Sequence, residues 1–336
     1  MSLSKFIISF ALFLTTGLAL SQQVPLDKQG AEKIAFNAHT CTGWFGSPNW
    51  KCVPLTVPGY LYRAKDNKSL VLISHGSQGA DGRHSNYAKQ LVSNGINALV
   101  IGHWEARGLA LVQKDYDAGR KQGGDGLNQT IDVLAVGSQL KAMPEWADTR
   151  FGHMGESMGG TTALNLTRPW MRRIHVSLYG SQPLQFTALA ALYGGCAERN
   201  TEEGFLPYPL LFINGTDDNL TLAADCERQV PWMNGRGGRA EIVLLPGEFH
   251  GFDNNRPLAS WPAENPAKCA SMQSPTGFTL DATGKQYPPT TEGFAQMKKD
   301  CIRLSPHSAI AGNKGDPRTG FKEWTEWFKK TLLSEV

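Results

Sequence analysis

The stretch from Phe151 to Gly160 constrains the fold more than any other part of the chain. It consists of a short apolar run, then Gly-x-Ser-x-Gly centred on Ser157, then a segment typical of a helix start. A sharp turn between a strand and a helix leaves no room for side chains around the serine, which explains Gly155 and Gly159. We expect this turn to present the Ser157 hydroxyl to solvent. The simpler alternative is an ordinary strand-to-helix turn.

The same turn supplies a backbone donor for negative charge. The amide of Met158 opens the expected helix, and a helix N-terminus carries partial positive charge. A second amide is expected from Ser77, in the His-Gly-Ser sequence that follows the apolar strand at 70–74. We therefore expect Met158 and Ser77 to stabilise an oxyanion formed beside Ser157. His75 is expected to order its loop by hydrogen bonding rather than to transfer a proton.

Apolar runs alternate with helical patterns along much of the chain. Strands are expected at 70–74, 96–101, 151–154, 187–193, 210–214 and 241–245, after an early antiparallel hairpin near 59–64. Helices are expected at 85–94, 129–140 and 321–332, while 174–178 also has a strand-like pattern and its role stays open. This alternation predicts an α/β fold, with a mostly parallel central sheet and helices on both faces. Functional residues should then lie at the carboxyl ends of the strands.

An acid and a histidine follow the last two expected strands. Asp218 comes after the strand at 210–214, and His250 after the strand at 241–245. Their order after Ser157 is the one that a catalytic triad on this kind of sheet requires. The imidazole would take the serine proton, and the carboxylate would hold its tautomer. Asp217 is the alternative acid, and the structural alternative is a pair of turn aspartates beside a surface histidine.

The N-terminus has the pattern of a secretory signal. Lys5 precedes an uncharged apolar run at 6–20, and Ala19-Leu20-Ser21 is a small-x-small cleavage site. We expect removal of residues 1–21 and a secreted or periplasmic protein that begins near Gln22. The apolar run is short for a membrane span, which needs about 20 residues, so no stable membrane anchor is expected.

Six cysteines behind such a signal indicate an oxidising compartment and three disulfides. Sequence alone leaves the pairing open. We expect Cys41–Cys52 to close a short N-terminal loop and Cys269–Cys301 to staple a late insertion. The cysteines and histidines show no zinc-ligand spacing, so no metal site is expected.

The remaining chain, 22–336, is expected to form one domain. Residues 22–58 look irregular, being rich in Gly, Pro, Trp and Thr, and residues 257–317 form a long insertion expected over the active-site face. The formal net charge is +3 and the basic residues are scattered, which argues against a nucleic-acid partner.

Together these segments resemble the dienelactone hydrolase family of α/β-hydrolases across most of residues 70–252. The resemblance rests on the segments at 74–77, 102–108, 155–159, 192–196, 215–218 and 250–253. It implies the α/β-hydrolase fold and hydrolysis of carboxylic esters or lactones without a cofactor. It also implies that Cys196 pairs with Cys226.

The chain departs from that family in several ways. The founding members use a cysteine where this chain has Ser157, and they are compact cytosolic proteins. His103 stands where relatives often have aspartate. Substrate identity therefore does not carry over from the resemblance. Candidate pocket residues are His75, Trp104, Glu105 and Arg107, and Arg107 is expected to meet a substrate carboxylate or to pair with Glu105.

The leading hypothesis is an exported serine hydrolase that forms an acyl-enzyme with a small ester or lactone. A non-catalytic binding protein with the same fold is the alternative, and the complete triad order argues against it. A small-peptide serine peptidase is less favoured, because no gating domain is evident in the sequence. The sequence does not indicate the oligomeric state.

Overall fold

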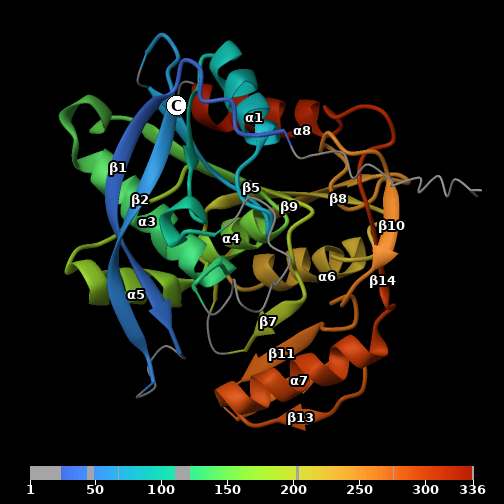
Figure 1. The fold of residues 1–336 in the computed structure, drawn as a ribbon. Coiled ribbons are helices and arrows are strands. Elements are labelled where there is room, and N and C mark those ends of the chain that lie inside the picture. The colour runs from blue at the N-terminus through green and yellow to red at the C-terminus, as the bar shows by residue number, and fades with distance from the viewer. Residues whose placement is uncertain are drawn as a thin grey trace, which may run out of the picture.

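A computed structural model describes the chain from residue 24 to residue 334, except for 44–48, 67, 110–121, 202–203 and 275 (Figure 1). The expected signal sequence, 1–21, lies outside the described residues. In the described segments, no helix is long and apolar enough to cross a membrane.

An eight-stranded sheet forms the centre of the molecule, in the order β1-β2-β4-β3-β5-β6-β8-β9. The six strands from β4 to β9 run parallel, and β1 and β2 join antiparallel at one edge. This arrangement confirms the predicted mostly parallel sheet. The strands are β1 (Glu32–Thr42), β2 (Lys51–Tyr62), β3 (Ser69–Ser74), β4 (Asn97–Ile101), β5 (Arg150–Glu156), β6 (Ala188–Leu192), β8 (Pro209–Gly215) and β9 (Arg239–Leu245).

Helices cover both faces of this sheet (Figure 1). One face carries α1 (Gly82–Ser93) and α8 (Phe321–Phe328). The other carries α3 (Gly126–Ala142), α4 (Met158–Leu166), α5 (Pro169–Tyr179) and α6 (Ala223–Asn234). Every residue of β3, β4 and β6 is buried, which is why these strands are apolar without alternation. The segment 174–178, whose role was open, belongs to helix α5.

Alternate residues of a central strand enter two separate cores. Leu70 and Leu72 of β3 pack with the cluster that includes α3 and α4, whereas Val71 and Ile73 pack with α1 and α8. The aromatic stripe of α8 belongs to the second cluster, and it continues into a π-helical turn at Lys329–Leu333. Short 3₁₀ turns lie at Glu105–Arg107 and Pro144–Trp146.

The expectation that residues 22–58 are irregular was wrong. Strands β1 and β2 pair along their whole length, and Cys41 lies opposite Cys52, to which it is disulfide-bonded. Pro54 and Pro58 obscured the second strand in the sequence. They are tolerated because this half of β2 pairs with β1 alone, and β4 joins only from Gly59 onward. The hairpin expected near 59–64 is the end of β2, with its partner upstream.

The insertion at 257–317 has secondary structure and a small core of its own. Strands β10 (Ala259–Pro262) and β14 (Ser308–Ala311) form one ribbon. Strands β11 (Ser271–Ser274), β12 (Gly277–Leu280) and β13 (Gln286–Tyr287) form a second sheet with β7 (Glu198–Asn200). Helix α7 (Thr291–Leu304) lies on that sheet (Figure 1). The Cys269–Cys301 disulfide lies in a buried cluster with Phe278, Leu280 and Met297.

Candidate active site

Ser157 occupies a strained turn between β5 and α4. Its φ is 53° and its ψ is −112°, a region that residues with a side chain rarely adopt. A Cβ at Gly155 would lie 2.4 Å from the Gly159 backbone, and one at Gly159 would lie 2.3 Å from the Ser74 carbonyl oxygen. A Cβ at Gly160 would lie 2.7 Å from the backbone of a neighbouring loop. The glycines of the motif are therefore required by the close approach of helix and sheet.

The structure brings together the three residues selected from the sequence. His250 Nε2 lies 3.0 Å from Ser157 Oγ, and His250 Nδ1 lies 2.9 Å from Asp218 Oδ2. The second Asp218 oxygen accepts hydrogen bonds from the amides of Leu220 and Thr221, which fix the carboxylate. Asp217, the alternative acid, is exposed, and its carboxylate bonds to the hydroxyl of the residue before it.

His250 and Asp218 shift each other's pKa in opposite directions. Burial alone would lower the pKa of His250, but the Asp218 carboxylate outweighs it, and the pKa lies above its usual value. Burial would raise the pKa of Asp218, yet the adjacent imidazole and two backbone donors hold it below its usual range. The His250 side chain is 13% exposed, so it is open to a substrate while Asp218 is shielded.

Two further residues brace the acid and the base. The Thr221 hydroxyl lies 2.8 Å from Asp218 Oδ2, 3.1 Å from His250 Nδ1 and 2.9 Å from the Tyr193 carbonyl oxygen. The Tyr193 ring packs edge-on against the His250 imidazole, with their centroids 4.8 Å apart. Tyr193 itself has a φ of 36°, the only described non-glycine residue besides Ser157 with positive φ. Neither Thr221 nor Tyr193 was predicted from the sequence to contact the triad.

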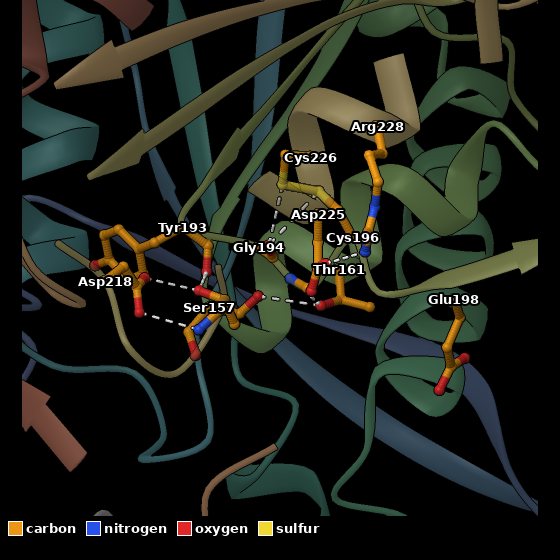
Figure 2. Close-up of a disulfide and its surroundings, with 12 residues drawn as sticks. Ser157, Thr161, Tyr193, Gly194, Cys196, Glu198, Asp218, Asp225, Cys226 and Arg228 are labelled. Carbon is orange, nitrogen blue, oxygen red and sulfur yellow. Dashed lines mark hydrogen bonds and ion pairs between the residues drawn. A yellow bond between two sulfur atoms is a disulfide. The ribbon is translucent and has the colours of Figure 1, made fainter. Parts of the chain in front are cut away.

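A disulfide lies beside the loop that follows β6 and contains Tyr193 and Gly194 (Figure 2). Cys196 follows the end of β6, Cys226 lies on α6, and the structure joins them as the resemblance implied. The intervening loop touches the nucleophile helix, because the Gly195 amide donates to Thr161 Oγ1 at 2.9 Å. The Thr161 hydroxyl in turn lies 3.4 Å from the Ser157 carbonyl oxygen. The disulfide therefore links α6, the helix after Asp218, to the loop that contacts α4, the helix after Ser157.

The two amides expected to form the oxyanion hole occupy suitable elements. Met158 is the first residue of α4, so its amide has no acceptor within the helix. Ser77 lies in the loop after β3, and its amide donates no hydrogen bond to another residue in the described part of the chain. Glu156 holds that loop, since its carboxylate accepts from the Gly76 amide at 2.6 Å. A Cβ at Gly76 would lie 2.5 Å from the same carboxylate, which explains the glycine.

Glu156 also belongs to a buried group of charges beneath the site. It lies 3.3 Å from the Arg83 guanidinium and 3.5 Å from His84 Nε2. Burial would raise the pKa of Glu156, but these cations lower it to about 2. Burial would lower the pKa of His84, and its carboxylate partners Asp81 and Glu156 raise it to about 9. The Glu156 carboxylate, which holds the loop of Ser77, is therefore ionised at neutral pH.

The four candidate pocket residues make most of their contacts with other parts of the protein. His75 is fully buried and bonds to the Gly76 carbonyl and the Trp104 amide, so it orders its loop as expected. Trp104 is buried as well. Glu105 is half-exposed and its contacts are with Tyr60, Lys28 and Lys33 near the N-terminus.

Both expectations for Arg107 were wrong. Its guanidinium is buried against Asp132, with Nη1 2.7 Å from Oδ2 and Nη2 3.2 Å from Oδ1. It therefore neither pairs with Glu105 nor offers a free charge to a substrate carboxylate. Asp132 lies on α3, and no motif in the sequence indicates that this helix lies beside Arg107.

A second serine–histidine–aspartate chain lies inside the molecule. Asp132 Oδ2 is 2.8 Å from His103 Nδ1, and His103 Nε2 is 3.0 Å from Ser74 Oγ. All three side chains are fully buried, and the Ser74 hydroxyl also meets His153 Nε2 at 2.9 Å. Burial lowers the pKa of His103 and that of His153, the latter to about 3. This chain ties neighbouring strand ends together and has no access for a substrate.

Among the residues that the structure describes, no group of three or more histidine, cysteine or carboxylate side chains could hold a metal ion.

The residues missed by sequence reasoning had weak signals. Glu156 stands inside the serine motif, and Thr221 lies three residues after Asp218. Neither position is informative until the loops are seen side by side.

A strained serine at a strand–helix turn, facing a histidine and an aspartate from later strand ends, defines an α/β-hydrolase. A model of the dienelactone hydrolase family matches residues 57–278. The chain belongs to this family. The chain is therefore a carboxylic-ester hydrolase, because a lactone is a cyclic carboxylic ester.

Solved structures with a similar fold share little sequence with this chain. Esterase 2 of the planctomycete Thermogutta terrifontis is 16% identical, with a TM-score of 0.47, over 68% of this chain and 86% of that one. A dienelactone hydrolase of Anabaena variabilis is 16% identical, with a TM-score of 0.44, over 66% of this chain and 88% of that one. No curated protein matches the chain in sequence.

The glycine packing at the turn is testable with one methyl group. In Gly159→Ala the new methyl meets the Ser74 carbonyl, so the turn must shift, and we expect at least about 100-fold loss of esterase kcat. Gly126→Ala is the matched control, because its Cβ would meet nothing closer than 3.8 Å. Equal activity of the two variants with p-nitrophenyl acetate would show that the close approach is not required.

Proposed function

We propose that this protein is a secreted serine hydrolase that cleaves small carboxylic esters or lactones through an acyl-enzyme. The observation that carries the proposal is the continuous chain of contacts from Asp218 through His250 to Ser157. Unlike the buried chain of Asp132, His103 and Ser74, this one ends at a serine with a strained backbone at the start of α4 and includes a histidine that is partly exposed.

In the acylation step, Ser157 Oγ attacks the ester carbonyl carbon while His250 Nε2 takes the hydroxyl proton. Asp218 stabilises the imidazolium and holds Nδ1–H toward itself. The carbonyl oxygen becomes an oxyanion and binds the amides of Met158 and Ser77. Collapse breaks the ester C–O bond, and His250 gives its proton to the leaving alkoxide.

Deacylation follows the same route with water as the nucleophile. His250 removes a proton from water as the hydroxyl oxygen attacks the acyl carbon. The second tetrahedral intermediate breaks the bond to Ser157 Oγ, which recovers its proton from His250. The products are a carboxylic acid and a free enzyme, and no cofactor enters the balance.

Ser157→Ala tests the function directly. Without the nucleophile, we expect kcat with p-nitrophenyl acetate to fall by about 10⁶-fold while the protein stays folded. Ser93→Ala, on the exposed side of α1, should retain wild-type activity. A fluorophosphonate probe should attach to Ser157, as read by peptide mass spectrometry. Full turnover by Ser157→Ala would rule out the proposal, and an unlabelled, inactive wild type would favour a non-catalytic binding protein.

The pH dependence should follow His250. The base must be neutral to accept a proton, so kcat/KM rises with pH through the raised pKa of His250. In Asp218→Asn the main raising influence is removed and burial then lowers the pKa. The acidic limb should move to lower pH, with kcat reduced by about 10⁴-fold. An acidic limb at the same pH in both proteins would contradict the assignment of Asp218.

Secretion is supported by the three disulfides together with the signal-like N-terminus. N-terminal sequencing of the protein recovered from the medium or periplasm should begin near Gln22. Recovery of the full-length chain in the cytosolic fraction, with its cysteines reduced, would contradict this part of the proposal.

A further inference from the structure

Strand β14 of the insertion reaches the loop that carries His250. The Gly312 amide, just after the strand, donates to the His250 carbonyl oxygen at 2.9 Å. His250 and Ala311 form a parallel bridge at the same place. The insertion thus holds the backbone of the base rather than only lying near it.

The same strand also holds the loop that carries the acid. Asn219 directly follows Asp218, and its Oδ1 accepts from the Ile310 amide at 3.0 Å. Its Nδ2 donates to the Ser308 carbonyl oxygen at 3.3 Å. The Asn219 side chain therefore pairs with β14 much as a neighbouring strand would.

These contacts use one edge of β14. Backbone groups two residues apart on a strand point to the same side, so Ser308, Ile310 and Gly312 present theirs together. The other edge of β14 pairs with β10. The edge of β14 that does not face β10 bonds to the acid loop at Ile310 and to the base loop at Gly312. Because these two positions are two residues apart on one strand, they set the distance between the two loops.

A buried asparagine completes the joint. Asn265 is fully buried, and its Nδ2 lies 2.8 Å from both the Asn219 carbonyl oxygen and the Ser308 carbonyl oxygen. Its Oδ1 accepts from the Ala267 amide at 2.8 Å. The insertion thus forms hydrogen bonds with both the side chain and the backbone carbonyl of Asn219, the residue after Asp218.

We propose that Asn219 is a positioning residue, which docks the acid loop on β14 so that the insertion fixes Asp218 relative to His250. The inference rests on the proposed function, because it concerns the same triad. It assigns the insertion a part in the geometry of the site, in addition to any role in covering it.

Asn219→Ala removes both side-chain contacts with β14. We expect kcat to fall by about 10- to 100-fold with little change in KM, since the Asn219 side chain bonds to β14. The charged groups that act on His250 are Asp218, Glu156 and Arg83, and only Asp218 lies on the loosened loop. The acidic limb of kcat/KM should therefore move to lower pH, a change that a purely structural defect would not produce.

Lys285→Ala is the matched control within the insertion. It breaks the 2.6 Å ion pair between Lys285 and Asp300, away from β14, and should leave kcat and the acidic limb unchanged. Asn219→Asp keeps the acceptor for Ile310 but places a carboxylate oxygen against the Ser308 carbonyl oxygen, so its kcat should also fall below that of the wild type.

Three outcomes would overturn the inference. The first is a folded Asn219→Ala with wild-type kcat, and the second is a loss of kcat with the acidic limb unmoved. If Asn219→Ala does not fold, a folded Asn219→Asp with wild-type kcat is the third. An active Ser157→Ala would instead defeat the proposed function. Inactive Ser157→Ala beside normal Asn219 variants would defeat the inference alone.

Discussion

The close approach of helix α4 to the sheet is the constraint on which the rest of the site depends. Gly159 lies against the Ser74 carbonyl and Gly160 against the backbone after β6, at separations that admit no side chain. Only this approach lets the chain reverse within one residue, and the strain falls on Ser157. Asp218 and His250 then need only reach the tip of one turn.

Much of this arrangement could be predicted from the sequence, because its causes are local. Glycines at fixed spacing specify the turn around Ser157, and unbroken apolar runs specify the buried strands. The hairpin of β1 and β2 escaped prediction because its prolines are tolerated only through the pairing pattern. The partner of Arg107 also escaped, since Asp132 comes from a distant helix and nothing near Arg107 in the chain indicates it.

Buried charge links loops that are distant in sequence. Glu156 holds the loop of Ser77 through the Gly76 amide and is neutralised by Arg83 and His84 of α1. On the opposite side, β14 holds the loops of the acid and the base. The residues of the candidate triad and the Ser77 loop are therefore held by two separate sets of contacts, one a buried group of charges and the other the edge of β14. A buried carboxylate that loses its partners would destabilise the protein, which keeps the first support in place.

The internal chain of Asp132, His103 and Ser74 reproduces the interatomic distances of the candidate triad. Its serine is fully buried and has no positive φ, and its hydroxyl is already shared with a second imidazole. Distance alone thus does not make a nucleophile in this protein. The Ser157 and Ser74 hydroxyls have the same kinds of neighbours, and they differ in whether the surrounding chain leaves them accessible to a ligand.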